Sequence, residues 1–215
     1  LPLYPRHLMI HPEADPAGTL AMPNLATVEG TKCYAAALDL LAERYTRDDA
    51  KFGRITNWIA HNEVDQAWTW TNMGEQPMPR FLETYYRSLR LIHYSARKYD
   101  PHARVFASFT HHWFHPGDGT RTYCTREMLR LLNHLSKAEG DFEWGVAYHP
   151  YPQDLRQQRT WEDRQATFSF DTPKITMRNI EVLAAYLKKP EFLFKGKSRP
   201  IMLSEQGFHT PTYSA

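Results

Sequence analysis

The feature that most constrains the fold of this chain is a repeated alternation of helical and strand-like segments. Apolar residues at spacings of three and four predict amphipathic helices in four segments, residues 32–45, 80–99, 125–140 and 176–190. Short apolar runs predict a strand after each helix, over residues 53–60, 103–109, 142–149 and 199–208. Parallel strands need a long crossover, usually a helix, and are apolar on both faces when helices cover them. The pattern therefore predicts an α/β domain built around a parallel sheet.

Residues at the ends of these segments support the boundaries. Asp100 and Pro101 are predicted to end the helix over residues 80–99, because proline cannot continue a helix. Thr125 is the predicted N-cap of the next helix, and Gly140 its C-terminal stop.

The loops distinguish between two kinds of parallel sheet. Connections that follow strands are long and aromatic, whereas those before strands are mostly short. The aromatic residues concerned are Trp68, Trp70, Trp113, Tyr151 and Trp161. In a (β/α) barrel the loops after the strands carry the chemistry. Because no Gly-rich phosphate-binding motif follows any strand, we expect a TIM-type (β/α) barrel and not a doubly wound sheet.

The barrel is expected to be incomplete. A (β/α)₈ barrel takes roughly 250 residues, and this chain of 215 residues contains four convincing strands. Any divergent strand would fall within residues 1–31. We interpret residues 1–215 as a single barrel domain, with a fragment of a longer chain as one form of that interpretation.

Composition narrows the class of partner. The formal net charge is +2 and there is no basic tail, which argues against nucleic acid or an anionic membrane surface as a partner. There is no apolar run of about 18 residues, so no membrane-spanning segment is predicted. The first residues lack the pattern of a signal peptide, and the chain begins without Met, which leads us to expect a processed product or a piece of a longer chain. Cys33 and Cys124 are compatible with one disulfide or with two free thiols. The oligomeric state is not defined by the sequence.

Two glutamates follow apolar strands directly. Glu63 comes after the run "ITNWIA" and Glu205 after "PIML". Because the carboxyl ends of parallel strands meet at one end of a barrel, both carboxylates are expected at its mouth. Glycoside hydrolysis uses such a pair, one acid to protonate the leaving oxygen and one to attack the anomeric carbon or activate water. Glu63 lies in an aromatic segment, which suits the acid, and Glu205 has the polar neighbours Ser204 and Gln206, which suit an ionised carboxylate.

Tryptophans near these strand ends have two interpretations. Trp68 and Trp70 lie in the polar run "QAWTWTNMG", and Trp113 follows the strand over residues 103–109. Indole rings exposed beside polar groups are suited to stacking on the apolar face of a sugar. The same residues could equally fill the core.

Two motifs carry a family resemblance. "WIAHNEVD" resembles the strand-four motif of the clan A glycoside hydrolases, and "IMLSEQGF" resembles the strand-seven motif of that clan. From about residue 11 to about residue 209, the chain is similar to an uncharacterised bacterial domain family related to the clan. The resemblance implies that the four strands are barrel strands four to seven, and that strands one to three and eight are not recognisable here.

The resemblance also implies roles for single residues. Glu63 would be the general acid/base, Glu205 the nucleophile, and Asn62 a ligand of the sugar 2-hydroxyl. Tyr148 or His149, at the end of the strand before that of Glu205, would orient the nucleophile.

Further implications concern the substrate site and the setting of the protein. His111, His112 and Trp113 would line the substrate subsites, although hydrogen-bonded wall residues are the simpler interpretation of the histidines. The implied protein is a retaining glycosidase of poly- or oligosaccharides, with no cofactor and no metal, in a secreted or periplasmic location. The same carboxylates can also transfer the sugar to an acceptor other than water.

Two alternatives stay open from the residues alone. A barrel lacking strands could bind carbohydrate without catalysis. A metallohydrolase could use His111, His112, His115 and His149 together with Glu63. The absence of a His-x-His at a strand end and of a His-Glu-x-x-His helix argues against the second alternative.

Overall fold

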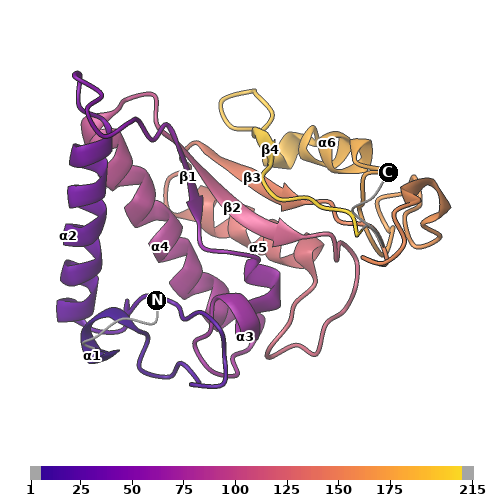
Figure 1. Ribbon diagram of the computed structural model, residues 1–215, viewed down its shortest axis with the longest axis horizontal. Helices are drawn as coiled ribbons and strands as arrows, with labels where there is room; N and C mark the ends of the chain where they lie inside the picture. Colours follow the sequence, from indigo (N-terminus) through magenta and orange to yellow (C-terminus); the bar gives the residue numbers. More distant parts are fainter. Residues whose placement is uncertain (1–5, 210–215) are drawn as a thin grey trace, which may run out of the picture.

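The computed structural model describes residues 6–209, and within this range the chain folds into a four-stranded parallel sheet with helices (Figure 1). The strands are β1 (Asn57–Ala60), β2 (Arg104–Thr110), β3 (Trp144–His149) and β4 (Ile201–Leu203). The α-helices are α1 (Arg6–Met9), α2 (Val28–Tyr45), α3 (Ala67–Trp70), α4 (Met78–Tyr99), α5 (Thr125–Ala138) and α6 (Glu181–Leu187). Three short 3₁₀ helices are η1 (Val64–Gln66), η2 (Thr160–Glu162) and η3 (Pro190–Phe192).

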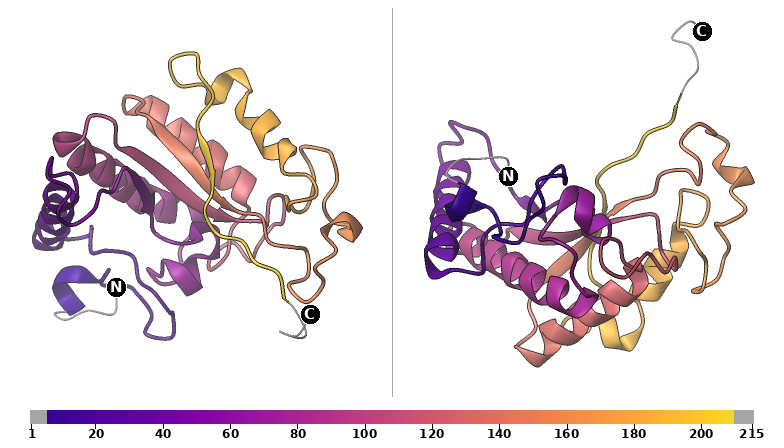
Figure 2. Two further views of the ribbon diagram at one scale, coloured as in Figure 1. Left: turned by 45° about the horizontal axis from the view of Figure 1, so that its top comes forward. Right: turned by 90° about the horizontal axis from the view of Figure 1, so that it is seen from below.

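The strand order can be compared with the two kinds of parallel sheet. The strands lie in sequence order, β1-β2-β3-β4, and every neighbouring pair is parallel. Right-handed crossovers between strands in sequence order place all connecting helices on one face. Figure 2 (right) shows α4, α5 and α6 on the same side of the sheet. A doubly wound sheet would reverse its order at a switch point; this sheet does not, and it is compatible with part of a (β/α) barrel. The described residues form no closed barrel.

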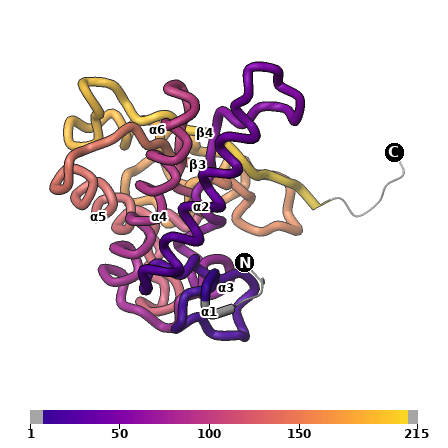
Figure 3. The backbone as a smooth tube through the Cα atoms, turned by 90° about the vertical axis from the view of Figure 1, so that its left-hand side faces the viewer, coloured from indigo at the N-terminus to yellow at the C-terminus, as the bar shows by residue number. Residues whose placement is uncertain are grey.

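The layer of helices begins beyond the first strand. Helix α2 packs beside α4, as Figure 3 shows. Its N-cap is Thr27, whose Oγ1 accepts the backbone N–H of Gly30 at 3.1 Å. The segment before α2 adds no strand to the sheet in the described part of the chain. It is fixed instead by single bridges, Ile10 to Pro23 and Ala21 to Asn72.

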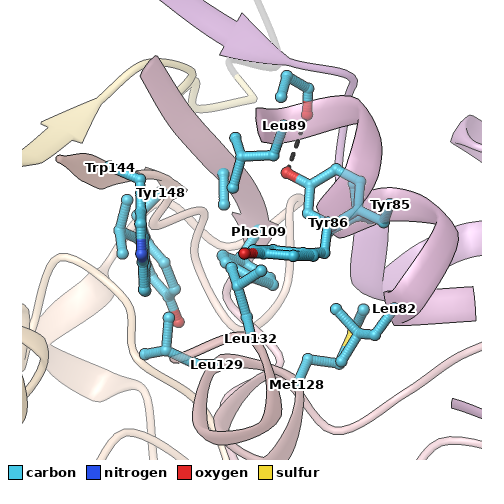
Figure 4. Close-up of a cluster of buried hydrophobic side chains, with 14 of the residues drawn as sticks. Leu82, Tyr85, Tyr86, Leu89, Phe109, Met128, Leu129, Leu132, Trp144 and Tyr148 are labelled. Carbon is cyan, nitrogen blue, oxygen red and sulfur yellow. Dashed lines mark hydrogen bonds between the residues drawn. The ribbon is translucent and has the colours of Figure 1, made fainter. Parts of the chain in front are cut away.

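The main core lies between the sheet and the helices. Side chains alternate between the two faces of a strand, and Phe109 of β2 and Tyr148 of β3 point into this core (Figure 4). Ser108, Thr110 and His149 therefore point to the opposite face. This alternation decides which residues at the strand ends can reach a common site.

The predicted element order is confirmed, and the differences lie at the boundaries. Strand β4 is shorter than predicted, since Pro200 has no N–H to donate to a ladder. Helix α6 begins at Glu181, because the Asn179 side chain instead accepts the Thr176 N–H and donates to the Thr167 carbonyl. The prediction of Thr125 as an N-cap was wrong: Cys124 holds that position, and Thr125 is the first residue of α5.

Other predictions are answered directly. Asp100 is the C-cap of α4, as predicted, and Gly140, at φ 86°, follows the end of α5. Cys33 and Cys124 are both free thiols. None of the helices within residues 6–209 is long and apolar enough to cross a membrane.

Candidate active site

The two strand-end glutamates converge at the carboxyl end of the sheet. Glu63 follows β1 and Glu205 follows β4, the two outermost strands of the order. On a flat sheet three strand spacings of about 4.8 Å would separate these strands by roughly 14 Å. One oxygen of each carboxylate and Nδ1 of His149 nevertheless all lie within 4.8 Å of one another. The glutamate side chains therefore meet over the ends of β2 and β3.

His149 joins the two carboxylates. Its Nδ1 lies 2.9 Å from Oε1 of Glu63 and 3.6 Å from Oε2 of Glu205. The imidazole is buried, with 3% of its side chain exposed, whereas the exposed fractions are 14% for Glu63 and 49% for Glu205. The site is thus built from one enclosed carboxylate and one solvated carboxylate, with a buried histidine between them.

Tyr151 fixes the solvated carboxylate. Its phenolic O–H donates to Oε1 of Glu205 at 2.8 Å. Burial, together with the hydrogen bond to Glu205, raises the pKa of Tyr151 to about 12, so the phenol stays protonated and remains a donor at neutral pH. Sequence reasoning noted Tyr151 only as a loop aromatic. The motif "YHPYP" holds the signal that could have found it, since Tyr151 lies two residues after a strand-end histidine.

The turn that presents Glu63 is unusual. His61 (φ 63°) and Glu63 (φ 38°) both adopt positive φ, which is uncommon for residues other than glycine. Two half-buried contacts hold the turn. Nε2 of His61 lies 2.8 Å from Oγ of Ser88 on α4, and the Glu63 N–H donates to Oγ of Ser108 on β2 at 3.0 Å. Strained conformations of this kind persist where the surrounding structure imposes them, often at functional sites.

Residues 4–215 match the model of DUF5722, a family of unknown function. The chain belongs to this family. A search of the curated proteins finds no match. The DUF5722 match spans both glutamates and the whole sheet but names no reaction, so only the geometry of the site bears on the chemistry.

Some of the predicted binding residues of this DUF5722 member lie beside Glu63. Asn62 is half-buried, and its carbonyl accepts the hydroxyl of Thr71 at 2.9 Å. Trp68 and Trp70 are half-buried on the short helix α3, which follows η1 directly. The guanidinium of Arg121 stacks over the Trp68 ring, 4.2 Å from its centroid. This cation occupies one face of the indole, which restricts Trp68 as a platform for a sugar.

Two predicted binding residues lie in the core instead. Trp113 is fully buried, packs edge-on against Tyr186 and donates its Nε1–H to the Phe170 carbonyl at 2.9 Å. Tyr148 is fully buried on the helix side of the sheet, beside Trp144 and Leu129 in Figure 4. The predictions for both residues need correction. The prediction for Tyr148 was wrong because neighbouring residues of a strand face opposite sides of the sheet, and it is His149 that faces the site.

The histidines after β2 form a separate cluster. The rings of His111 and His112 stack with centroids 4.4 Å apart, and His115 meets His112 edge-on. Burial lowers the pKa of His111 to about 3 and that of His112 to about 4, so both are neutral near pH 7. Within the described residues they do not join Glu63 and His149 in one cluster of metal-ligating atoms.

Asp65 is a buried acid that sequence reasoning missed. It lies on η1, two residues after Glu63, and is fully buried. Its Oδ1 accepts the Thr110 N–H at 2.9 Å, and its Oδ2 accepts the Thr110 hydroxyl. A fully buried carboxylate was not recognisable from its position in a polar segment.

Proposed function

We propose that this chain carries a retaining glycoside hydrolase site, with Glu63 as general acid/base and Glu205 as nucleophile. The observation that supports this most is the approach of the two carboxylates, with an oxygen of each within 4.8 Å. Retaining enzymes hold their two carboxyl groups about 5 to 5.5 Å apart, whereas inverting enzymes leave about 6.5 to 9.5 Å for a water molecule. The separation here belongs with the shorter class.

The environments of the two acids support the assignment of roles. Glu63 is the more enclosed of the two, with 14% of its side chain exposed, and an enclosed carboxyl group is typical of the general acid in such sites. Glu205 is 49% exposed, and its Oε1 accepts a hydrogen bond from Tyr151, which orients the carboxylate and leaves Oε2 for attack on the anomeric carbon. His149 lies between them and can fix the orientation of each.

The proposed reaction has two steps. In the first, an oxygen of Glu205 bonds to the anomeric carbon while the bond to the leaving oxygen breaks, and Glu63 gives its proton to that oxygen. In the second, Glu63 takes a proton from water, the water oxygen attacks the anomeric carbon, and the glycosyl bond to Glu205 breaks. An acceptor sugar in place of water would give transglycosylation.

The test begins with a panel of aryl glycosides of different sugars. For any glycoside that is turned over, the first-formed product should keep the anomeric configuration of the substrate by proton NMR. Glu205→Ala should lower kcat by about 10³-fold or more, an expectation from the loss of covalent catalysis. Azide should restore turnover of this variant and give a glycosyl azide of inverted configuration, because azide replaces the missing nucleophile.

Glu63→Gln tests the role of Glu63 as general acid/base. Its kcat/KM, which reports the first step, should fall steeply for glycosides with poor leaving groups and little for dinitrophenyl glycosides, whose departure needs no proton. Its kcat should fall for dinitrophenyl glycosides too, because the second step then lacks its base. Glu83→Gln on the surface of α4 is the matched control and should behave like the wild type. Inverted products, or a loss independent of the leaving group, would contradict the proposal. If the wild type binds a sugar but turns over no glycoside, and Glu205→Gln keeps that binding, a non-catalytic binding protein is favoured.

A metal-dependent hydrolase is the second candidate, and one observation favours it. Nδ1 of His149 and an oxygen from each glutamate form a set of nitrogen and oxygen donors of the kind that Zn²⁺ or Mn²⁺ binds. Exhaustive dialysis against a chelator distinguishes the two candidates. The retaining glycosidase should keep its activity, whereas a metal-dependent enzyme should lose it and recover on addition of Zn²⁺ or Mn²⁺.

A further inference from the structure

The position of the Glu63 carboxylate depends on a backbone conformation that its own residue does not favour. Glu63 has φ 38° and ψ 60°, in the left-handed region, and so cannot rely on local preference to keep its shape. From this turn the side chain reaches His149, with Oε1 of Glu63 2.9 Å from Nδ1 of the imidazole. Contacts from outside the turn must therefore hold it.

Two side-chain hydrogen-bond sites connect the turn to β2. Before η1, the Glu63 N–H donates to Oγ of Ser108. Within η1, the Asp65 carboxylate accepts both the N–H and the hydroxyl of Thr110. Ser108 and Thr110 are two residues apart and share one face of β2. The Glu63 turn is thus attached to β2 at two points, at the N–H of Glu63 itself and at the side chain of Asp65.

The second connection ends next to His149. Thr110 is the register partner of His149 in the β2–β3 ladder. Any displacement of η1 relative to Thr110 is therefore a displacement of Glu63 relative to His149. The carbonyl of Asp65 also accepts the Tyr123 N–H at 2.9 Å, which ties the loop before α5 to the same residue.

The environment of Asp65 is unusual for a carboxyl group. It is fully buried, and within residues 6–209 no cation is among the groups that act on its charge. The groups that face it are Glu63 on its own segment, Thr110 on β2 and Tyr148 on β3. Burial raises the pKa of Asp65 to about 6. Buried acids without a counter-ion are unfavourable for stability alone, and they concentrate at functional sites.

We propose that Asp65 is a positioning residue, which clamps the Glu63 turn to Thr110 and so holds the Glu63 carboxylate against His149. This inference rests on the proposed function, in which Glu63 gives and takes the proton. Asp65 touches neither substrate nor reacting atoms in this assignment. Its effect passes through Glu63.

Two substitutions separate the clamp from the charge. Asp65→Ala removes both hydrogen bonds to Thr110. Asp65→Asn keeps an oxygen for the Thr110 N–H and offers an N–H₂ to the Thr110 hydroxyl, which can turn to accept it. With a glycoside that the wild type hydrolyses, Asp65→Ala should lower kcat about 10- to 100-fold while KM changes less than about threefold, as expected when an interaction made in the transition state is lost. Asp65→Asn should restore most of kcat.

A double-mutant cycle gives the decisive kinetic result. In the Glu63→Gln background, Asp65→Ala should cost little further activity, because the residue through which it acts is already disabled. An equal further loss in that background would overturn the proposal, as would a change in KM alone. Ser108→Ala, which removes the other connection and leaves Asp65 intact, should show the same coupling to Glu63; if Asp65→Ala fails to fold, this variant and Asp65→Asn carry the test.

A measurement without substrate separates this inference from the proposed function. Nitrogen NMR of the His149 ring reports whether Nδ1 is hydrogen-bonded to Glu63. The Nδ1 signal should change in Asp65→Ala and stay near that of the wild type in Asp65→Asn, whether or not any glycoside is cleaved. An unchanged signal in folded Asp65→Ala would overturn the clamp, even if the glycosidase proposal holds.

Discussion

At the scale of single residues, the face of a strand decided what each side chain can do. Tyr148 and His149 are neighbours in the sequence, and either could have oriented a nucleophile. The structure places the Tyr148 ring among the helices and the His149 ring between the two glutamates. The phenolic oxygen of Tyr148 is buried and has no hydrogen-bond partner within residues 6–209. A buried hydroxyl without a partner lowers stability by about 1 to 3 kcal/mol.

Tyr148→Phe tests this placement. The substitution removes the unpartnered oxygen and leaves the ring, so the free energy of unfolding should stay equal or rise by about 1 kcal/mol. Turnover should change little, because the Tyr148 hydroxyl faces Asp65 without a hydrogen bond to it and the ring lies in the core. Urea unfolding and the aryl glycoside assay measure the two effects. A large loss of turnover in a stable variant would return Tyr148 to the site.

At the scale of elements, one arginine joins the segments that begin the last two strands. Arg199 precedes β4, and its side chain is fully buried. The guanidinium donates to both carboxylate oxygens of Asp141, at 2.8 and 2.9 Å, and to the Phe142 carbonyl at 3.1 Å. It also stacks over the Trp144 ring, 3.8 Å from the centroid. The short strand β4, and with it Glu205, depends on this anchor.

Arg199→Ala should be strongly destabilising. Removing one partner leaves Asp141 without its counter-charge, and breaking a buried pair typically costs about 3 to 5 kcal/mol. The midpoint of urea unfolding should fall accordingly. The control is Arg87→Ala on the surface of α4, which removes an exposed pair with Glu83 and should cost about 0.5 kcal/mol or less. Equal effects of the two substitutions would contradict the anchoring role.

At the scale of the whole molecule, several histidines are kept neutral by the fold. Burial lowers the pKa of five histidines, His11, His61, His93, His111 and His112. For His93, burial first and then the nearby Arg97 lower the pKa to about 4. The unfolded chain takes up protons on these rings near pH 6.5, while the folded chain does not. Their contribution to stability is therefore complete above about pH 6.5 and is lost as the pH falls towards 4.

Acid sensitivity can be measured through His93. The wild type should lose stability between about pH 6.5 and pH 4, seen as a falling urea midpoint. His93→Leu removes one of these rings and should show a shallower fall over the same range. His134→Leu, at an exposed position on α5, is the matched control and should follow the wild type. A slope for His93→Leu as steep as that of the wild type would contradict the assignment.

The sequence by itself determined the order of elements and the end of the sheet where the two glutamates lie. Both follow from local patterns, the helical and strand periods, and from the rule that parallel strands share their carboxyl ends. Only the tertiary structure showed that Tyr151 and Asp65 lie at the candidate site. It also showed that Trp113 and Tyr148 lie in the core instead. The reason is physical: a periodic pattern does not state which face of a strand meets the helices or how far a side chain reaches across neighbouring strands. Glu63 lies 86 positions before His149 in the chain, and Glu205 lies 56 positions after it. Only the folded sheet brings the three side chains together.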